Sequence, residues 1–372
     1  MTEMKTEYTG QPWLLVPNKI RSAGGRETDR FRGCPDPKDT PSGAEAWIGS
    51  VTRANGATTE RPDLGCSEVI LPGGEKRYLY RVIGDAPAEV LGEEHLKHHG
   101  TQLGVLVKLL DAKEKFPLQC HPTREKAARL WNSPYGKTEC WHVLAVREDA
   151  KEPPFIWLGF KPGITPRKFE EAYRTGSLEA AEAFCHRFNV HPGETWFVPS
   201  GMPHALGPGC FVLEVQEPSD LTAVPIPQED LIAFRRRSNP SGVFEPIDNA
   251  VYEKRTLGSF EYEGLEAEEV VSRCRVRRKV LREGSRGAEE LLIGPEQTPF
   301  FSCSLVRAEG EAPIKNSGDI AIGVVTEGEG TLRSRYGRLQ VRRGSEIFFP
   351  AHADQVYLEG SASMILCRPG RL

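Results

Sequence analysis

The stretch GETWFVPSGMPHALG, residues 193–207, decides the fold prediction for this 372-residue chain. Its first half, residues 194–199, has the aromatic and β-branched residues of a strand. Pro199 and Gly201 then favour a tight turn. We expect this turn to direct His204 back over the open end of a β-barrel. At this point an incidental histidine in an ordinary β-turn remains the alternative.

Two upstream segments offer side chains that could join this histidine. In FPLQCHP (116–122), interpreted as a strand, Gln119 and His121 are two residues apart and share a face. In YGKTECWHVLAV (135–146) the same alternation places Lys137 and Glu139 on one face. Cys140 and His142 point to the other face, which argues against them as ligands.

One set of nitrogen and oxygen donors therefore emerges. It consists of Gln119, His121, Glu139 and His204. Two imidazoles, a carboxylate and an amide oxygen suit Zn²⁺, with iron, manganese, cobalt or nickel also open. An uncompensated buried carboxylate would be costly, which favours a metal partner. The alternative is a polar barrel interior without metal.

The composition limits the function classes. Lys+Arg is 48 against Asp+Glu 52, so the chain lacks the basic surplus of a nucleic-acid-coating protein. The N-terminus has no apolar signal region, and no segment is long and apolar enough to span a bilayer. The nine cysteines are scattered without a CxxC pair, which favours reduced thiols in a cytoplasmic protein. The oligomeric state stays open.

The chain reads as mainly β. Gly 37 and Pro 29 fit many short strands joined by tight turns, for which a barrel or sandwich is the natural closure. Residues 163–188 are helical in pattern, with Thr165 as N-cap and Pro166 at the first helical position. Residues 225–245 read as a connection, and the remainder, from about residue 255, as short strands. We predict two domains, 1–250 with the helical insertion and 251–372.

The three motif segments, in this order, resemble the class I mannose-6-phosphate isomerase family of the cupin superfamily. VLVKLLDA (105–112), AEAWIGS (44–50) and FVLEVQEPSD (211–220) extend the resemblance over most of residues 44–220. It implies two cupin-type (jelly-roll) β-barrel domains, the first catalytic and metal-binding and the second metal-free. In the second, FFPAHADQV (348–356) is similar to the cupin turn, but His352 is its only histidine and has no partner ligands.

The resemblance also implies a reaction. The family interconverts mannose 6-phosphate and fructose 6-phosphate, an aldose–ketose isomerisation through an enediolate, with one Zn²⁺ per chain. By the resemblance, the metal ligands are Gln119, His121, Glu139 and His204. Lys137 matches a family lysine proposed to take part in proton transfer, and Glu214 matches an active-site glutamate.

Two positions depart from the family pattern, and both concern the substrate. Pro117 stands where the family has a phosphate-holding serine, and Val224 where it has an active-site arginine. These changes favour an isomerase or epimerase of an unphosphorylated sugar. A non-catalytic sugar-binding cupin is a further alternative, against which Lys137 and Glu214 argue. Lys113, Lys115 and the arginines at 235–237 are possible substitutes, although we interpret the arginine triplet as a solvated loop.

Overall fold

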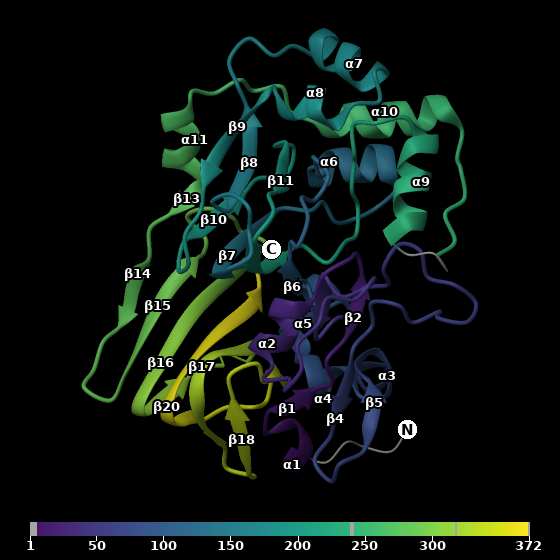
Figure 1. Cartoon of the computed structure of the whole chain (residues 1–372). Coiled ribbons are helices and arrows are strands. Elements are labelled where there is room, and N and C mark those ends of the chain that lie inside the picture. Colours follow the sequence, from purple (N-terminus) through teal and green to yellow (C-terminus); the bar gives the residue numbers. More distant parts are fainter. Residues whose placement is uncertain (1–5, 239–241, 317, 371–372) are drawn as a thin grey trace.

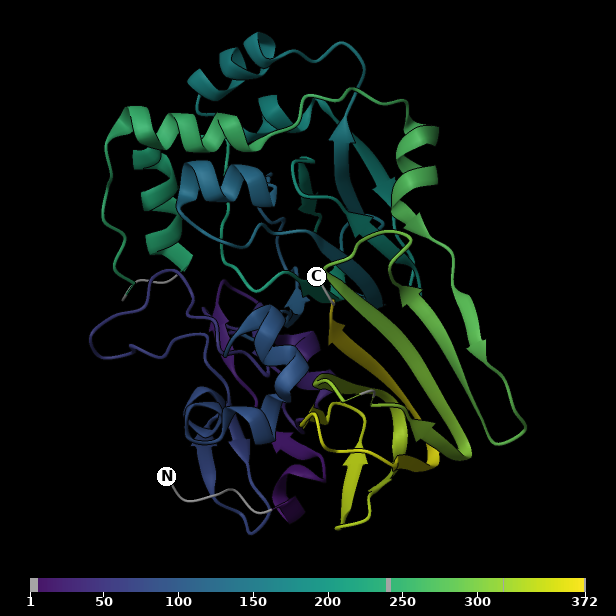
Figure 2. The same cartoon turned by 180° about the vertical axis from the view of Figure 1, so that it is seen from behind.

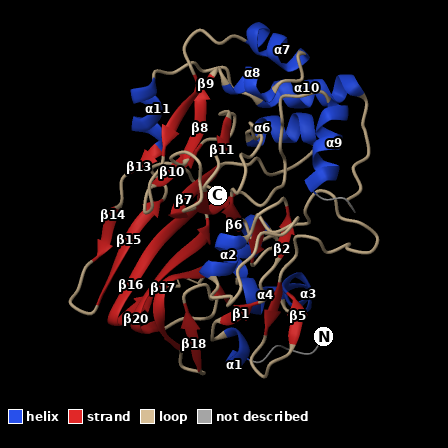
Figure 3. Ribbon diagram, in the orientation of Figure 1, coloured by secondary structure: helices blue, strands red, loops and turns tan. Residues whose placement is uncertain are grey.

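The computed structural model describes residues 6–238, 242–316 and 318–370. Its named strands pair antiparallel and form one large sheet, a second of intermediate size and a small third one. The prediction of a mainly β chain is confirmed. Figure 3 shows the strands concentrated in one body of the molecule, with many of the helices gathered at one end.

The 10-stranded sheet contains most of the C-terminal third of the chain (Figure 1, green to yellow). Its order is β14 (Lys279–Arg282), β15 (Gly287–Ile293), β16 (Phe301–Ile314), β20 (Val356–Pro369), β17 (Ala321–Arg333), β19 (Glu346–Phe349), β1 (Trp13–Leu15), β4 (Glu68–Ile70) and β5 (Lys76–Tyr78), and β18 (Arg338–Arg342) pairs with β17. The N-terminal strands thus complete a C-terminal sheet, because β1 pairs with β19. Strand pairing therefore crosses the predicted boundary at residue 250, which stays a prediction.

The other two sheets position the candidate site. The 7-stranded sheet has the order β13 (Arg275–Val276), β10 (Thr195–Val198), β7 (Glu139–Val146), β12 (Cys210–Gln216), β6 (Leu106–Asp111), β3 (Glu45–Ile48) and β2 (Lys19–Arg21). The 3-stranded sheet has the order β11 (His204–Leu206), β8 (Phe155–Phe160) and β9 (Cys185–Asn189). Strands β7, β12 and β6 form the buried centre of the 7-stranded sheet.

The helices fall into two groups (Figure 2). The N-terminal group contains α1 (Thr6–Thr9), α2 (Arg26–Phe31), α3 (Leu79–Asp85), α4 (Pro87–Leu91) and α5 (Glu93–His99). The other contains α6 (Arg124–Lys126), the π-helix η1 (Ala127–Trp131), α7 (Pro166–Arg174), α8 (Leu178–Glu182), α9 (Gln228–Ser238), α10 (Asn249–Ser259) and α11 (Ala267–Cys274). The insertion predicted at 163–188 contains α7 and α8, and the Thr165 side chain caps α7 by accepting from the backbone N–H of Lys168. No helix in the described ranges is long and apolar enough to cross a membrane.

Two secondary-structure predictions between residues 225 and 275 were wrong. Residues 228–238, expected within a connection, form α9, because this stretch contains no proline and acidic residues begin a helix that ends in arginines. That charge order complements the helix dipole. Residues 267–274, expected among strands, form α11, which begins with a capping box between Glu266 and Glu269.

The predicted strand at 116–121 was also wrong. Only Gln119 and Cys120 form isolated bridges, to His204 and Ala223. Pro117 has no backbone N–H to give to a ladder, so regular pairing cannot extend through it. The segment nevertheless lies beside the start of β11, because Gln119 pairs with His204. This contact brings His121 close to His204.

Candidate metal centre and its cavity

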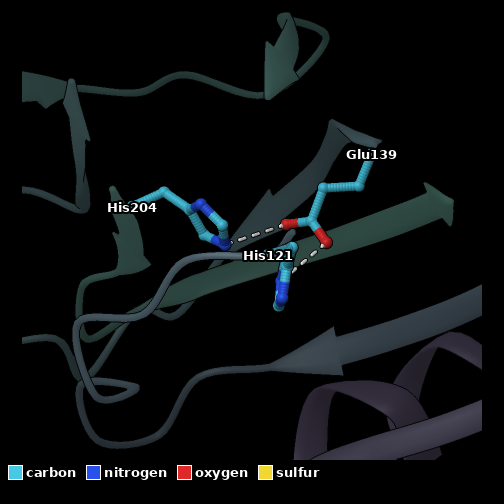
Figure 4. A group of neighbouring side chains, drawn as sticks. All are labelled: His121, Glu139 and His204. Carbon is cyan, nitrogen blue, oxygen red and sulfur yellow. Dashed lines mark ion pairs between the residues drawn. The ribbon is translucent and has the colours of Figure 1, made fainter. Parts of the chain in front are cut away.

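Three buried side chains, His121, Glu139 and His204, meet at the end of the 7-stranded sheet where β7 begins (Figure 4). Nε2 of His121 lies 3.2 Å from Oε2 of Glu139, and Nε2 of His204 lies 3.4 Å from Oε1 of the same carboxylate. Their potential ligand atoms all lie within 4.8 Å of one another. Among the described residues, this is the one such group of three or more His, Cys, Asp or Glu side chains.

Backbone hydrogen bonds hold the turn predicted from residues 193–207 against the QCH segment. Gln119 and His204 exchange two backbone hydrogen bonds, of 3.0 and 2.9 Å between nitrogen and oxygen. The backbone N–H of Gly201 donates to the carbonyl of His121 over 2.7 Å. Gly201 has φ +89°, a conformation that favours glycine over other residues. The turn therefore fixes both histidines relative to each other before any ligand binds.

The hydrogen bond that Nδ1 of each histidine makes fixes the tautomer of the ring and leaves Nε2 facing the site. Nδ1 of His121 is 2.7 Å from the carbonyl of Leu221, and Nδ1 of His204 is 2.8 Å from the carbonyl of Met202. Carbonyls only accept, so both Nδ1 atoms carry the proton and both Nε2 atoms present a lone pair. This is the arrangement that orients metal-ligating histidines.

Orphaned buried atoms show that the group fits a cation. Nε2 of His204 and Oε1 of Glu139 are buried and have no hydrogen-bond partner among the described residues, while Oε2 of Glu139 has only the ion pair with Lys137. Buried polar atoms without partners are costly, and a divalent metal would satisfy all of them at once. The mixed nitrogen and oxygen donor set suits zinc and neighbouring divalent metals.

Charge and burial set the protonation states. Burial, and then the positive charge of Lys137, lower the pKa of His121 to about 3. Burial also lowers the pKa of His204. Burial alone would raise the pKa of Glu139, but attraction to Lys137 and both histidines outweighs it and holds that pKa well below its usual range. The two imidazoles are therefore neutral and the carboxylate ionised, which is the state that a metal requires.

The other predicted residues line a cavity of about 340 Å³; the three residues of the metal group do not line it, but Lys137 contacts both the cavity and that group. Gln119, the predicted fourth ligand, lines it. Lys137 also lines it, with Nζ 2.6 Å from Nε2 of His121 and 2.9 Å from Oε2 of Glu139. Glu214 lines it from β12, where its Oε2 accepts a hydrogen bond of 3.0 Å from Nε1 of Trp141.

The face alternation predicted for residues 137–142 agrees with the contacts. Glu139 belongs to the metal group, whereas Cys140 packs in the hydrophobic core on the opposite side of β7. His142 forms a hydrogen bond of 2.9 Å to Oγ1 of Thr195. Neither Cys140 nor His142 belongs to the metal group.

Lys108 is a site residue that sequence reasoning missed. It stands directly opposite Glu214 in the pairing of β6 with β12, and its Nζ lies 2.9 Å from Oε1 of Glu214. Both side chains are buried. The available signal was a single charged residue inside the apolar run VLVKLLDA, because a buried lysine needs a carboxylate partner.

A second buried charge network lies at the other wall of the cavity. Arg21 holds Asp220 through two hydrogen bonds of 2.8 and 2.7 Å and also contacts Glu45 at 2.9 Å. Asp220 lies in the segment FVLEVQEPSD but was not among the predicted site residues. The two residues that depart from the family pattern, Pro117 and Val224, both line this cavity.

Comparison with known proteins agrees with this geometry. The model of the mannose-6-phosphate isomerase cupin domain matches residues 294–369. A probable mannose-6-phosphate isomerase of Bacillus subtilis is 27% identical over 270 residues, covering 73% of this chain and 76% of the relative. A second mannose-6-phosphate isomerase of that organism is 26% identical over 279 residues, covering 73% of this chain and 79% of the relative.

These matches support the cupin-superfamily phosphomannose isomerase family as the one that the chain resembles. The crystal structure of mannose 6-phosphate isomerase from B. subtilis superposes with a TM-score of 0.70 at 20% identity, covering 96% of this chain and 99% of that one. A zinc-bound mannose 6-phosphate isomerase superposes with a TM-score of 0.69 at 18% identity, covering 97% and 100%. The family resemblance and the predicted cupin-type fold class are confirmed.

Proposed function

We propose that this protein is a metal-dependent aldose–ketose isomerase that converts mannose 6-phosphate to fructose 6-phosphate. One observation carries the proposal. The buried group His121, Glu139 and His204 is in direct contact with Lys137, and Lys137 lines one cavity together with Glu214. The names of the curated relatives and of the superposed structures support the same reaction.

The proposed metal ligands are His121, Glu139 and His204, with Gln119 as the fourth. We propose zinc, because the donor set suits it and a superposed isomerase is zinc-bound. When bound there, zinc would supply a positive charge that stabilises negative charge developing on substrate oxygens.

The reaction moves one proton from C2 to C1 of the open-chain sugar. We propose Lys137, acting as the neutral amine that the positive charge of a bound metal would favour, as the group that takes this proton and returns it, because its Nζ contacts the metal group and lines the cavity. Removing the C2 proton turns its C–H electron pair into the C1–C2 double bond of an enediolate, and the carbonyl electron pair moves to O1. Returning the proton to C1, with the hydroxyl proton passing from O2 to O1, gives the ketose. Glu214, fixed by Lys108 and Trp141, would hold a substrate hydroxyl by accepting its hydrogen bond.

The same proposal assigns different roles to the two predicted domains. Residues 1–250 would hold the catalytic centre, and residues 251–372 would form a metal-free cupin-like domain. We also propose a cytoplasmic location, in which the thiols stay reduced, since all nine cysteines are free. No nucleic acid or membrane partner is proposed.

A second candidate function has a specific observation in its favour. Pro117 and Val224 line the cavity and offer no charge to a phosphate group. An isomerase of an unphosphorylated sugar would need none. Mannose and mannose 6-phosphate therefore distinguish the two candidates.

The test is turnover by purified, zinc-loaded protein, measured as formation of fructose 6-phosphate from mannose 6-phosphate, with free mannose run in parallel. We expect turnover of the phosphosugar at a kcat/KM at least about tenfold above that for mannose, the discrimination that one well-formed charged contact supplies. Turnover of mannose alone would support the second candidate. No turnover of either sugar by metal-loaded protein would contradict both isomerase candidates.

A further inference from the structure

The charges that line the cavity are unevenly paired. Six cationic side chains line it: Arg21, Lys108, Lys115, Lys137, Arg235 and Arg237. Four of them have carboxylate partners. Arg21 pairs with Asp220 and Glu45, Lys108 with Glu214, Lys115 with Glu179 and Glu182, and Lys137 with Glu139. Within the described part of the chain, no carboxylate pairs with Arg235 or Arg237. The surplus positive charge of the cavity therefore belongs to one helix, α9.

Helical spacing explains why Arg235 faces the cavity. It lies four residues after Leu231, so the two share a face of α9. Leu231 is buried in a small apolar cluster with Val224 and Ile226, which fixes that face against the segment leading into the helix. Arg235 is half-buried as a result, whereas the next residue, Arg236, is exposed and does not line the cavity.

The surroundings of Arg235 disfavour an unaccompanied charge. Burial, and then repulsion from Arg21, lower its pKa from the usual arginine value. Its guanidinium carbon lies 6.0 Å from the centre of the Phe244 ring, and among the described residues no group accepts a hydrogen bond from its donors. A half-buried guanidinium that has neither an acceptor nor a carboxylate among the described residues is suited to an anion that arrives with the substrate.

We infer that Arg235 is the phosphate anchor of this enzyme, with Arg237 as a second cation at the same wall. The inference rests on the proposed function and assigns the phosphate group of the sugar phosphate to α9. The planar guanidinium can give two parallel hydrogen bonds to one phosphate group. Arginine is the side chain best matched to that geometry, and lysine would supply a point charge only.

This assignment accounts for the uncharged residues at Pro117 and Val224. Val224 packs against Leu231 of α9. The uncharged residue at position 224 is therefore covered by the same helix that carries Arg235. Arg235, one helical turn after Leu231, thus supplies the positive charge that position 224 lacks. The earlier interpretation of the arginine triplet as a solvated loop was wrong, because residues 235–237 lie on α9 and two of them line the cavity.

Steady-state kinetics with matched variants test the inference. We expect Arg235→Ala to raise the KM for mannose 6-phosphate about tenfold to a hundredfold, the range for a lost charged hydrogen bond. The kcat should change less than threefold, and turnover of free mannose should not respond. Arg235→Lys should recover part of the loss. Arg236→Ala, from the same basic helix end but outside the cavity, is the matched control and should leave the KM within twofold.

A binding measurement separates this inference from the proposed reaction. Inorganic phosphate is titrated into metal-free protein by calorimetry, with wild type, Arg235→Ala and Arg236→Ala compared. We expect millimolar binding by the wild type and by Arg236→Ala, weakened at least about tenfold in Arg235→Ala. Equal binding by all three proteins, or no millimolar binding by the wild type, would overturn the phosphate anchor. If the wild type binds phosphate through Arg235 but does not isomerise mannose 6-phosphate, the proposed reaction fails and the anion site stands.

Discussion

The molecule contains two similar turns that end in a histidine, and they have opposite outcomes. In the first, β10 leads into Pro199, and His204 follows five residues later as the first residue of β11, with its side chain buried. In the second, β19 leads into Pro350, and His352 follows only two residues later, exposed, in the turn before β20. The longer turn brings His204 beside Gln119 and into the buried metal group, whereas the shorter one leaves His352 exposed.

The two regions also treat a buried carboxylate differently. Glu139 meets two neutral imidazoles, and Lys137 forms an ion pair with its Oε2, while its Oε1 accepts no hydrogen bond among the described residues. Glu346 on β19 meets Arg32, whose Nε lies 2.8 Å from its Oε1. The interior beside Glu346 is filled by apolar side chains such as Phe349 and Met364. Glu139 therefore has two imidazole nitrogens beside it with which it could share a metal ion, whereas Glu346 has the internal Arg32.

The largest expected effect is on the first turn. His204→Ala removes one of the two lone-pair nitrogens of the metal group, so we expect loss of bound zinc and at least about a thousandfold loss of turnover. Metal content by plasma mass spectrometry and kcat measure the two effects. His352→Ala is the matched control, and we expect it to keep full metal content and activity. Full zinc occupancy in His204→Ala would show that the ligand set is wrong.

Lys137 lies next to the same carboxylate but is not a proposed ligand. We expect Lys137→Ala to keep zinc and to lower kcat about a hundredfold to ten-thousandfold, the usual contribution of a proton-transferring side chain. The KM for mannose 6-phosphate should change little. Unchanged turnover in the zinc-loaded variant would rule Lys137 out as the base.

Substitution of Glu214, the partner of Lys108, should lower turnover less than the loss of His204 does. Glu214→Gln keeps the shape that accepts from Trp141 but leaves the buried Lys108 without its carboxylate. We expect kcat to fall about a hundredfold with zinc retained, together with a loss of roughly 3–5 kcal/mol in the free energy of unfolding. In the double variant Glu214→Gln with Lys108→Met, stability should recover but turnover should not. Recovery of both would indicate that the pair has only a structural role.

Strand parity explains how much of this site could be predicted from sequence. A period of two predicts that Glu139 and Lys137 share a face and that Cys140 does not, and the packing of Cys140 in the core agrees. The same rule cannot show which distant strands are neighbours. The pairing of β6 with β12 brings Lys108 to Glu214 across about a hundred residues of sequence, and no local pattern encodes that register.

Helix α9 shows a different reason for failure. Pro225 and Pro227 suggested an extended connection, although proline at a helix start is compatible with a helix. The acidic residues after Pro227 and the arginines that follow were the missed signal, since this order complements the helix dipole. The pairing of β1 with β19 could not be predicted at all, because residues more than three hundred positions apart meet there.

The smallest expected effect on turnover concerns Glu346, which sharpens the comparison of the two carboxylates. Burial raises the pKa of Glu346, and Arg32 opposes that rise. Arg32→Ala should therefore raise the pKa further and lower the free energy of unfolding by about 3–5 kcal/mol at pH 7. Because the folded-state pKa would lie above the unfolded value of about 4.3, the loss should shrink as the pH falls through the folded-state pKa.

Urea unfolding at pH 7 and pH 5 measures this dependence, with Glu346→Gln as the control that removes the charge and keeps the shape. That control should be less destabilised than Arg32→Ala at pH 7 and should not vary with pH through this group. Turnover of either folded variant should match the wild type, because the pair lies outside the catalytic cavity. An equal loss of stability at both pH values would show that charge burial is not the cause. A pH-dependent loss would establish that an internal arginine does for Glu346 what we assign to an external cation for Glu139.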